Sequence, residues 1–257
     1  RAWGAYEASG RAFLPPETSA ALAALEDAVR GDQPIVFETG SEEEYLRAHK
    51  LAAEYGVDAW YRGSGQEYRI LDVLRGRTDP LIIPLSFPDA PNVNDPESAL
   101  NASLADLRDW YLAPTSPAQL AGAGVRFAIT SDGLSSLNEF LPNLRIAVAR
   151  GLSTVDALAA LTTTPAEWLG LENTHGTIQE GKVANLVVSE GDLFTEEATV
   201  RDVWVHGQAY GVTRSPQIDP RGTWRIASDD EWGFEAALRL EGPLNRLRGS
   251  IDIAGPD

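Results

Sequence analysis

Short apolar runs and longer segments of helical periodicity alternate along the first two thirds of the chain. Each short run is bounded by Gly, Pro or polar residues, which predicts a buried strand. These strands are predicted at 34–37, 57–61, 80–83 and 125–129. Helices are predicted at 18–30, 41–55, 66–75, 99–112, 116–123, 138–150 and 153–162, with another beginning at Pro165. Strands and helices alternating at this spacing indicate a parallel sheet with right-handed crossovers.

The pattern changes after residue 170. Short alternating segments separated by Gly, at 176–178, 184–189, 200–206 and 208–212, predict a small β-domain. Residues 216–220 are predicted to be a linker, and 222–226 and 236–240 to be strands of a further β unit. The sequence therefore predicts three parts, at residues 1–170, 171–213 and 214–257.

The fourth predicted strand ends in Thr130-Ser131-Asp132-Gly133. An acid at the carboxyl end of a buried strand stands where α/β folds, and barrels above all, place their chemistry. Aspartate is also a favoured helix N-cap, and a helical pattern follows by Leu137. Taken alone, these residues leave both roles open for Asp132.

Composition excludes several classes of function. The net charge is −17, with the acids spread along the chain, which argues against a nucleic acid or an anionic membrane as partner. The absence of cysteine excludes disulfides, thiolate catalysis and a cysteine-based zinc site. No apolar run is long enough to span a bilayer, and no secretory h-region opens the sequence. Because the chain begins with Arg1 and residues 2–16 lack the pattern of a domain start, we expect it to be a piece of a longer protein.

Three stretches form a recognisable series. The first is Phe127-Ala-Ile-Thr-Ser-Asp132-Gly133, and the second, 151–166, begins Gly-Leu-Ser-Thr-Val-Asp. The third, 169–187, contains Gly181-Lys182-Val-Ala-Asn185-Leu. Together they resemble the amidohydrolase superfamily, in particular the imidazolonepropionase-like members found in large multidomain secreted bacterial proteins. The third motif usually ends Gly-Lys-Ala-Asp-Leu in that family, so Val183 and Asn185 depart from it.

The resemblance implies an α/β fold: the C-terminal half of a TIM-like (β/α)8 barrel, followed by part of a composite β-sandwich and the start of another β unit. Asp132 would end barrel strand eight, where the family uses this aspartate as general base and ligand of a divalent metal such as zinc. Glu38, Arg62 and Ser64 would line the mouth and bind substrate. The resemblance also implies an extracytoplasmic location.

The histidines that the family places after strands five and six are missing. Those strand ends are Phe37-Glu38-Thr39 and Tyr61-Arg62-Gly63, so the neutral nitrogen donors that suit zinc are absent, although Glu38 offers oxygen to a hard cation. His49 is predicted to be solvated in mid-helix, His175 to lie in a turn and His206 in an edge β segment. The glycines of Gly63-Ser-Gly65 either form an anion site at a helix N-terminus or serve a tight turn.

Two functions therefore stay open. One is a hydrolase of C–N bonds in cyclic amides or peptide-like substrates, which the retained Thr-Ser-Asp-Gly favours. The other is a catalytically inactive module for binding or scaffolding in a larger secreted protein, which the missing histidines favour. A carbohydrate-binding role for the unit with Trp224 and Trp232 rests on its aromatic residues alone. Because a half barrel exposes two sheet edges and an apolar face, we expect a partner: the missing N-terminal half or a second copy of the chain.

Overall fold

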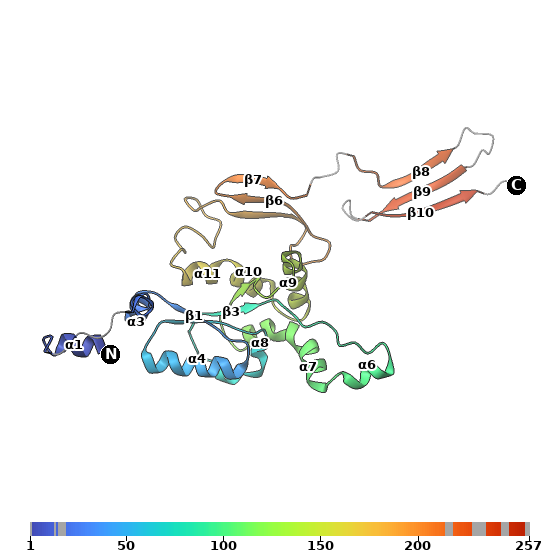
Figure 1. The fold of residues 1–257 in the computed structure, drawn as a ribbon. Coiled ribbons are helices and arrows are strands. Elements are labelled where there is room, and N and C mark those ends of the chain that lie inside the picture. The colour runs from blue at the N-terminus through green and yellow to red at the C-terminus, as the bar shows by residue number, and fades with distance from the viewer. Residues whose placement is uncertain are drawn as a thin grey trace. The chain divides into compact units, whose positions relative to one another are not determined.

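The computed structural model describes residues 2–12, 14, 19–213, 218–227, 235–242 and 247–254. The chain divides into two compact units, Arg1–Trp168 and Leu169–Asp257. The first unit holds a parallel sheet with helices, and the second holds two antiparallel sheets (Figure 1). Trp232, the first residue of the predicted helix 18–30 and part of the predicted linker at 216–220 lie outside the described residues.

The first unit is a mixed α/β structure. Its four strands pair in parallel in the order β1-β2-β3-β4, which fits part of a TIM-like barrel. In chain order its elements are α1 (Ala2–Ala8), α2 (Ala20–Ala23), α3 (Glu26–Arg30), β1 (Ile35–Glu38), α4 (Glu42–Tyr55), β2 (Ala59–Arg62), η1 (Glu67–Arg69), α5 (Leu71–Leu74), β3 (Leu81–Pro84), α6 (Pro96–Asn101), α7 (Leu104–Leu112), η2 (Ala113–Thr115), α8 (Ser116–Gly122), β4 (Ala128–Thr130), η3 (Leu137–Glu139), α9 (Phe140–Ala149), α10 (Thr154–Leu161) and α11 (Thr163–Trp168).

The two faces of the parallel sheet differ in burial. Side chains alternate between the faces along each strand, and the register places Phe37, Tyr61 and Leu81 side by side. Tyr61 is only 1% exposed, because α4 lays Tyr45 against it with ring centroids 4.8 Å apart. Figure 1 shows α4 running along the sheet. On the other face Val36 is 53% exposed, so the chain covers that face only in part.

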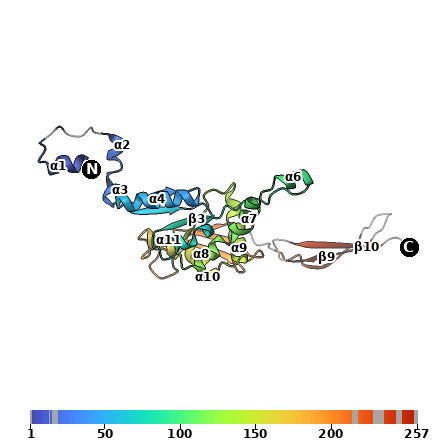
Figure 2. The same cartoon turned by 90° about the horizontal axis from the view of Figure 1, so that it is seen from below.

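Two long helices predicted from periodicity are interrupted. The predicted helix 18–30 is the two short helices α2 and α3, and Leu25 and Val29 of its apolar stripe remain exposed. Helix stability comes mainly from packing of the apolar face, which is lacking here. The predicted helix 99–112 is broken by Ser103, which starts α7 with a capping box to Asp106. Figure 2 shows α6, before this break, projecting away from the sheet.

The second unit contains two separate three-stranded antiparallel sheets. The first comprises β5 (Leu186–Glu190), β6 (Thr199–Val205) and β7 (Gln208–Gly211), and the second β8 (Gly222–Ala227), β9 (Glu235–Glu241) and β10 (Arg248–Ala254). Strand β10 was not predicted from the sequence. In the second sheet the register aligns Trp224, Leu238 and Ile251 on one face, opposite a polar face.

The prediction of a strand at 176–178 is wrong. These residues form no strand, and Ile178 is 86% exposed. Side-chain hydrogen bonds organise the segment instead. The ammonium of Lys182 donates to the carbonyl of Glu172 and to Oγ1 of Thr177, both at 2.6 Å.

None of the helices in the described parts of the chain is long and apolar enough to cross a membrane.

Candidate functional site

The carboxyl ends of the four parallel strands gather polar and charged residues. Parallel strands end at the same edge of a sheet, and ligands of open α/β sheets bind at that edge. The register pairs Glu38, the last residue of β1, with Arg62, the last residue of β2. Two residues beyond β4 stands Asp132, so three charged residues come from three strand ends. This group of Glu38, Arg62 and Asp132 is called the strand-end triad below.

Arg62 and Asp132 form an ion pair. Nη2 of Arg62 lies 2.7 Å from Oδ2 of Asp132, and Nη1 donates to the carbonyl of Gly63 at 3.1 Å. The Arg62 side chain is 22% exposed and that of Asp132 is 61% exposed. The guanidinium is thus anchored at two nitrogens, while the carboxylate still meets solvent.

Asp132 does not cap the following helix. The N-cap of η3 is Ser136, whose hydroxyl accepts a hydrogen bond from the N–H of Asn138 at 3.3 Å. The backbone N–H of Asp132 itself donates to Oγ1 of Thr130 at 3.1 Å, which bends the chain at the end of β4. Of the two roles that the sequence leaves open, the cap is therefore excluded.

The turn after β2 binds a carboxyl group, and that group belongs to Glu67 of the same chain. The N–H groups of Ser64 and Gly65 donate to Oε1 of Glu67 at 2.6 and 3.1 Å. Glu67 is 4% exposed, and burial raises the pKa of its carboxyl group, against the lowering effect of these hydrogen bonds. The hydroxyl of Ser64 accepts from the N–H of Gln66 at 3.2 Å. Ser64, predicted to bind substrate, is thereby engaged in closing its own turn.

The sequence analysis missed Glu67, although a pattern was present. Ser64 and Glu67 have the spacing of a capping box, in which the acid reaches back to the N–H of the first residue. Gly63 confirms how close this packing is: a Cβ added there would lie 2.1 Å from Oε1 of Glu67. The second carboxylate oxygen, Oε2, is buried without a hydrogen-bond partner.

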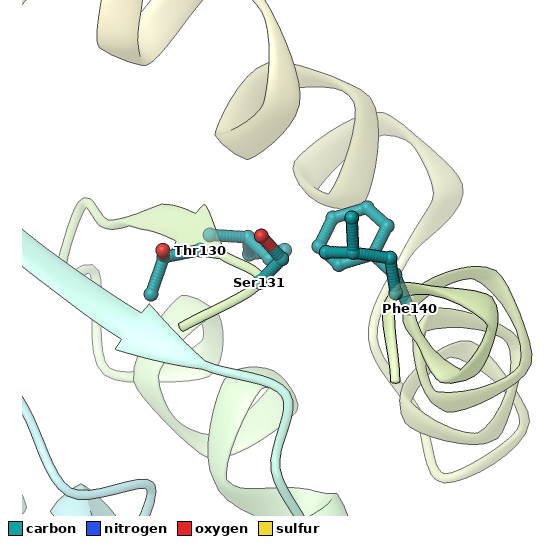
Figure 3. A pocket seen from close by; sticks show the side chains of 5 residues that line it. Thr130, Ser131 and Phe140 are labelled. Atoms are coloured by element: carbon teal, nitrogen blue, oxygen red, sulfur yellow. The ribbon is translucent and has the colours of Figure 1, made fainter. Parts of the chain in front are cut away.

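A pocket of about 440 Å³ opens next to the end of β4. Thr130 and Ser131 line it from the strand end, and Figure 3 shows the ring of Phe140, from the start of α9, beside the Ser131 side chain. Ile129 and Leu137 complete its lining. The pocket therefore combines apolar walls with two hydroxyl-bearing residues, directly before Asp132 in the chain.

The histidines lie away from the strand-end triad or take part in other contacts. His49 is not solvated as predicted: its ring lies parallel to that of Tyr45, and its Nδ1 is 3.3 Å from Oη of Tyr61. Arg77 also hydrogen-bonds the imidazole. His206 lies in the turn between β6 and β7 rather than in a strand, and His175 contacts the hydroxyl of Thr174 at 2.8 Å.

The residues at the strand ends do not fit a zinc site. Zinc prefers imidazole and thiolate ligands with a few carboxylates, in tetrahedral geometry. Across the described residues, no group of three or more His, Asp or Glu side chains is arranged to hold a metal ion. Asp132 is already bound by Arg62, and Arg62 also neighbours Glu38 in the register. A permanent positive charge thus already contacts the Asp132 carboxylate, and it belongs to the residue that pairs with Glu38 in the strand register.

Comparisons with known proteins agree with this architecture. Residues 114–213 match the model of the amidohydrolase family. An amidohydrolase from Thermotoga maritima MSB8 aligns with a TM-score of 0.61 and 26% identity, over 82% of this chain and 51% of that chain. A prolidase complexed with N-methylphosphonate-L-proline aligns with a TM-score of 0.53 and 21% identity, over 74% of this chain and 48% of that one. Another solved amidohydrolase aligns with a TM-score of 0.52 and 18% identity, over 74% and 47%.

The chain spans about half the length of these solved structures. No curated protein sequence matches it. The family match, which covers residues 114–213, nevertheless agrees with the resemblance to the amidohydrolase superfamily that the three sequence motifs carry, and the solved neighbours agree with it in fold.

Proposed function

We propose that the chain is the C-terminal half of a hydrolase of the amidohydrolase superfamily, of its imidazolonepropionase-like branch, acting on C–N bonds of cyclic amides or peptide-like substrates. The observation that carries the proposal is the strand-end triad, because enzymes built on parallel α/β barrels place their chemistry at this edge. A prolidase is among the solved structures with the same fold, which supports testing peptide-like amides first.

Within this proposal Asp132 is the general base. Its carboxylate is 61% exposed, and the ion pair to Arg62 engages Oδ2, so proton transfer would use Oδ1. Arg62 holds the carboxylate in place, and Glu38 lies beside Arg62 in the register. Ile129, Leu137 and Phe140 offer apolar contacts to a substrate that enters the adjacent pocket. Ser64 shapes the edge through the turn that Glu67 closes.

A partner is part of the proposal. β1 and β4 are the two edge strands of the parallel sheet, and Val36 is 53% exposed on the face opposite α4. Unpaired edges and uncovered apolar residues invite pairing with another chain. We therefore propose that the missing N-terminal half or a second copy completes the barrel. Sedimentation of the isolated chain tests this, because a monodisperse monomer would count against the need for either partner.

A catalytically inactive binding or scaffolding module is the second candidate. The specific observation in its favour is the Arg62–Asp132 ion pair in a strand-end set without histidine. A hydrolase needs the Oδ1 oxygen of Asp132 to accept a proton. A module without chemistry needs Asp132 only as the ion-pair partner of Arg62.

Hydrolysis assays on the full-length protein separate the two candidates. Dipeptides, including Xaa-Pro, and cyclic amides are the substrates, and the protein is purified without chelators and examined for metal by elemental analysis. The hydrolase proposal expects turnover that falls at least 100-fold in Asp132→Asn and is unchanged in Glu97→Gln, an exposed acid on α6. Absence of turnover from the folded protein favours the inactive module. Metal well below one ion per chain excludes a metal-dependent form of the hydrolase.

A further inference from the structure

We infer that Arg62 is the resident cation of this barrel edge: it takes the charge-partner role toward Asp132 that the family resemblance assigns to a metal ion, and the edge therefore excludes divalent metal. This role of Arg62 concerns the same site as the proposed function, and its relevance to catalysis rests on that proposed function. Its evidence and its test do not depend on hydrolysis.

The guanidinium of Arg62 is held at two of its nitrogens. Nη2 contacts Oδ2 of Asp132 at 2.7 Å, and Nη1 donates to the carbonyl of Gly63 at 3.1 Å. Arginine is planar and permanently charged, so contacts from two of its nitrogens fix both its position and its orientation. With its side chain only 22% exposed, Arg62 is a fixed part of the edge and differs from a mobile surface arginine.

The chain after β4 leaves room for the guanidinium of Arg62. Gly133 has φ +81°, a conformation that glycine adopts readily. A Cβ added to Gly133 would lie 3.1 Å from Nη2 of Arg62 and 3.5 Å from Cβ of Ser86. Glycine is therefore favoured at position 133 for two reasons. The backbone has a positive φ, and a Cβ there would crowd the guanidinium of Arg62.

The positive charge of Arg62 opposes the binding of a metal ion at the strand ends. Glu38 flanks Arg62 in the register on one side, and Asp132 binds it on the other. A divalent ion bound by these two carboxylates would stand close to a positive charge that cannot be removed by deprotonation. The guanidinium therefore already neutralises the Asp132 carboxylate, and replacing Arg62 and its register neighbour Glu38 by histidine should convert the edge into a metal site. A pair of histidines with an aspartate supplies donors that zinc accepts.

Calorimetric titration with zinc ions alone tests the inference on the whole chain. The wild type should show no stoichiometric binding at micromolar zinc. The variant E38H/R62H should bind one ion per chain at least 100-fold more tightly, and adding D132N should weaken that binding at least 10-fold. R126H is the matched control, because it places an imidazole beside Glu167 in an exposed ion pair away from the edge, and it should gain no tight site.

Two results would overturn the inference. One is stoichiometric zinc binding by the wild type that is lost in D132N. The other is a folded E38H/R62H variant, judged by circular dichroism and an unchanged thermal midpoint, that gains no zinc binding. If E38H/R62H does not fold, R62H alone replaces it, and the wild-type titration requires no variant. Hydrolysis by a metal-free full-length protein would leave the inference intact, whereas loss of hydrolysis without zinc binding would remove only the proposed activity.

Discussion

The guanidinium of Arg62 joins the end of β2 to the chain just after β4, across the intervening strand β3, through its 2.7 Å contact with Asp132. This contact connects two residues that are far apart in the sequence and lie on strands without mutual backbone hydrogen bonds. It engages one oxygen of the exposed Asp132 carboxylate, and its contribution should be measurable in stability as well as in metal binding.

A double-mutant cycle with Arg62→Gln and Asp132→Asn should give a coupling of about 0.5–1 kcal/mol, because one partner is well shielded and the other is open to solvent. Urea unfolding of the four proteins measures it. The Arg126–Glu167 pair, with side chains 55% and 57% exposed, is the control and should couple by less than about 0.5 kcal/mol. Equal coupling in the two cycles would mean that the Arg62 pair is an ordinary surface contact.

Gly63→Ala should destabilise the first unit by about 1–3 kcal/mol, because the new Cβ would meet the buried carboxylate of Glu67, 2.1 Å away, and that carboxylate is pinned by hydrogen bonds. Thermal or urea unfolding provides the measurement. Gly122→Ala in α8 is the matched control, since nothing lies within 4 Å of its added Cβ, and it should be neutral or slightly stabilising. A Gly63→Ala protein as stable as the wild type would show that the turn adapts freely.

Glu67 should make stability depend on pH. Burial raises the pKa of its carboxyl group, so the folded state holds the proton to higher pH than the unfolded state. Stability contributed by the protonated form is then present below the ordinary glutamate pKa and is lost as pH rises through the folded value. Relative to Glu67→Gln, the wild type should become less stable as the pH is raised from about 4 toward neutrality. Urea unfolding at several pH values measures the difference.

The control for this prediction is Glu97→Gln, on the exposed helix α6, which should follow the pH dependence of the wild type. Parallel curves for the wild type and Glu67→Gln would contradict the assignment of a raised pKa to Glu67.

The hydroxyl groups of Tyr45 and Tyr61 should ionise at a higher pH than that of an ordinary tyrosine. Desolvation raises the pKa of each to about 12, because their rings pack together between α4 and the sheet. A tyrosine ionises near pH 10 when unfolded, so folded-state stability should fall between about pH 10 and about pH 12. Ultraviolet titration of tyrosinate should show a late step.

The late step should shrink in Tyr45→Phe and in Tyr61→Phe, and should be unchanged in Tyr210→Phe, on the exposed strand β7. A tyrosinate titration complete near the ordinary value in the native protein would contradict the packing of this pair.

Several elements were predictable because their cause is local. Ser41 caps α4 by accepting from the N–H of Glu44, and Gly56 ends that helix with φ 64°, as the sequence pattern indicates. The four parallel strands follow from short apolar runs bounded by turn residues. Other predictions failed because packing decided them. Leu25 and Val29 form a regular stripe but remain exposed, and His49 joins an aromatic cluster through Tyr61, a residue of another element.

The sequence by itself determined that Asp132 follows a buried strand, since an apolar run that stops at small polar residues and an acid is a local pattern. Only the tertiary structure decided what Asp132 does there. Its partner Arg62 and the glycine that admits that partner meet through parallel pairing of strands, which no local spacing records. The same holds for Glu67, whose carboxylate reaches the turn only when η1 is formed and buried. Local patterns fix which groups stand at a strand end, and three-dimensional charge pairing fixes which of them remain available for chemistry.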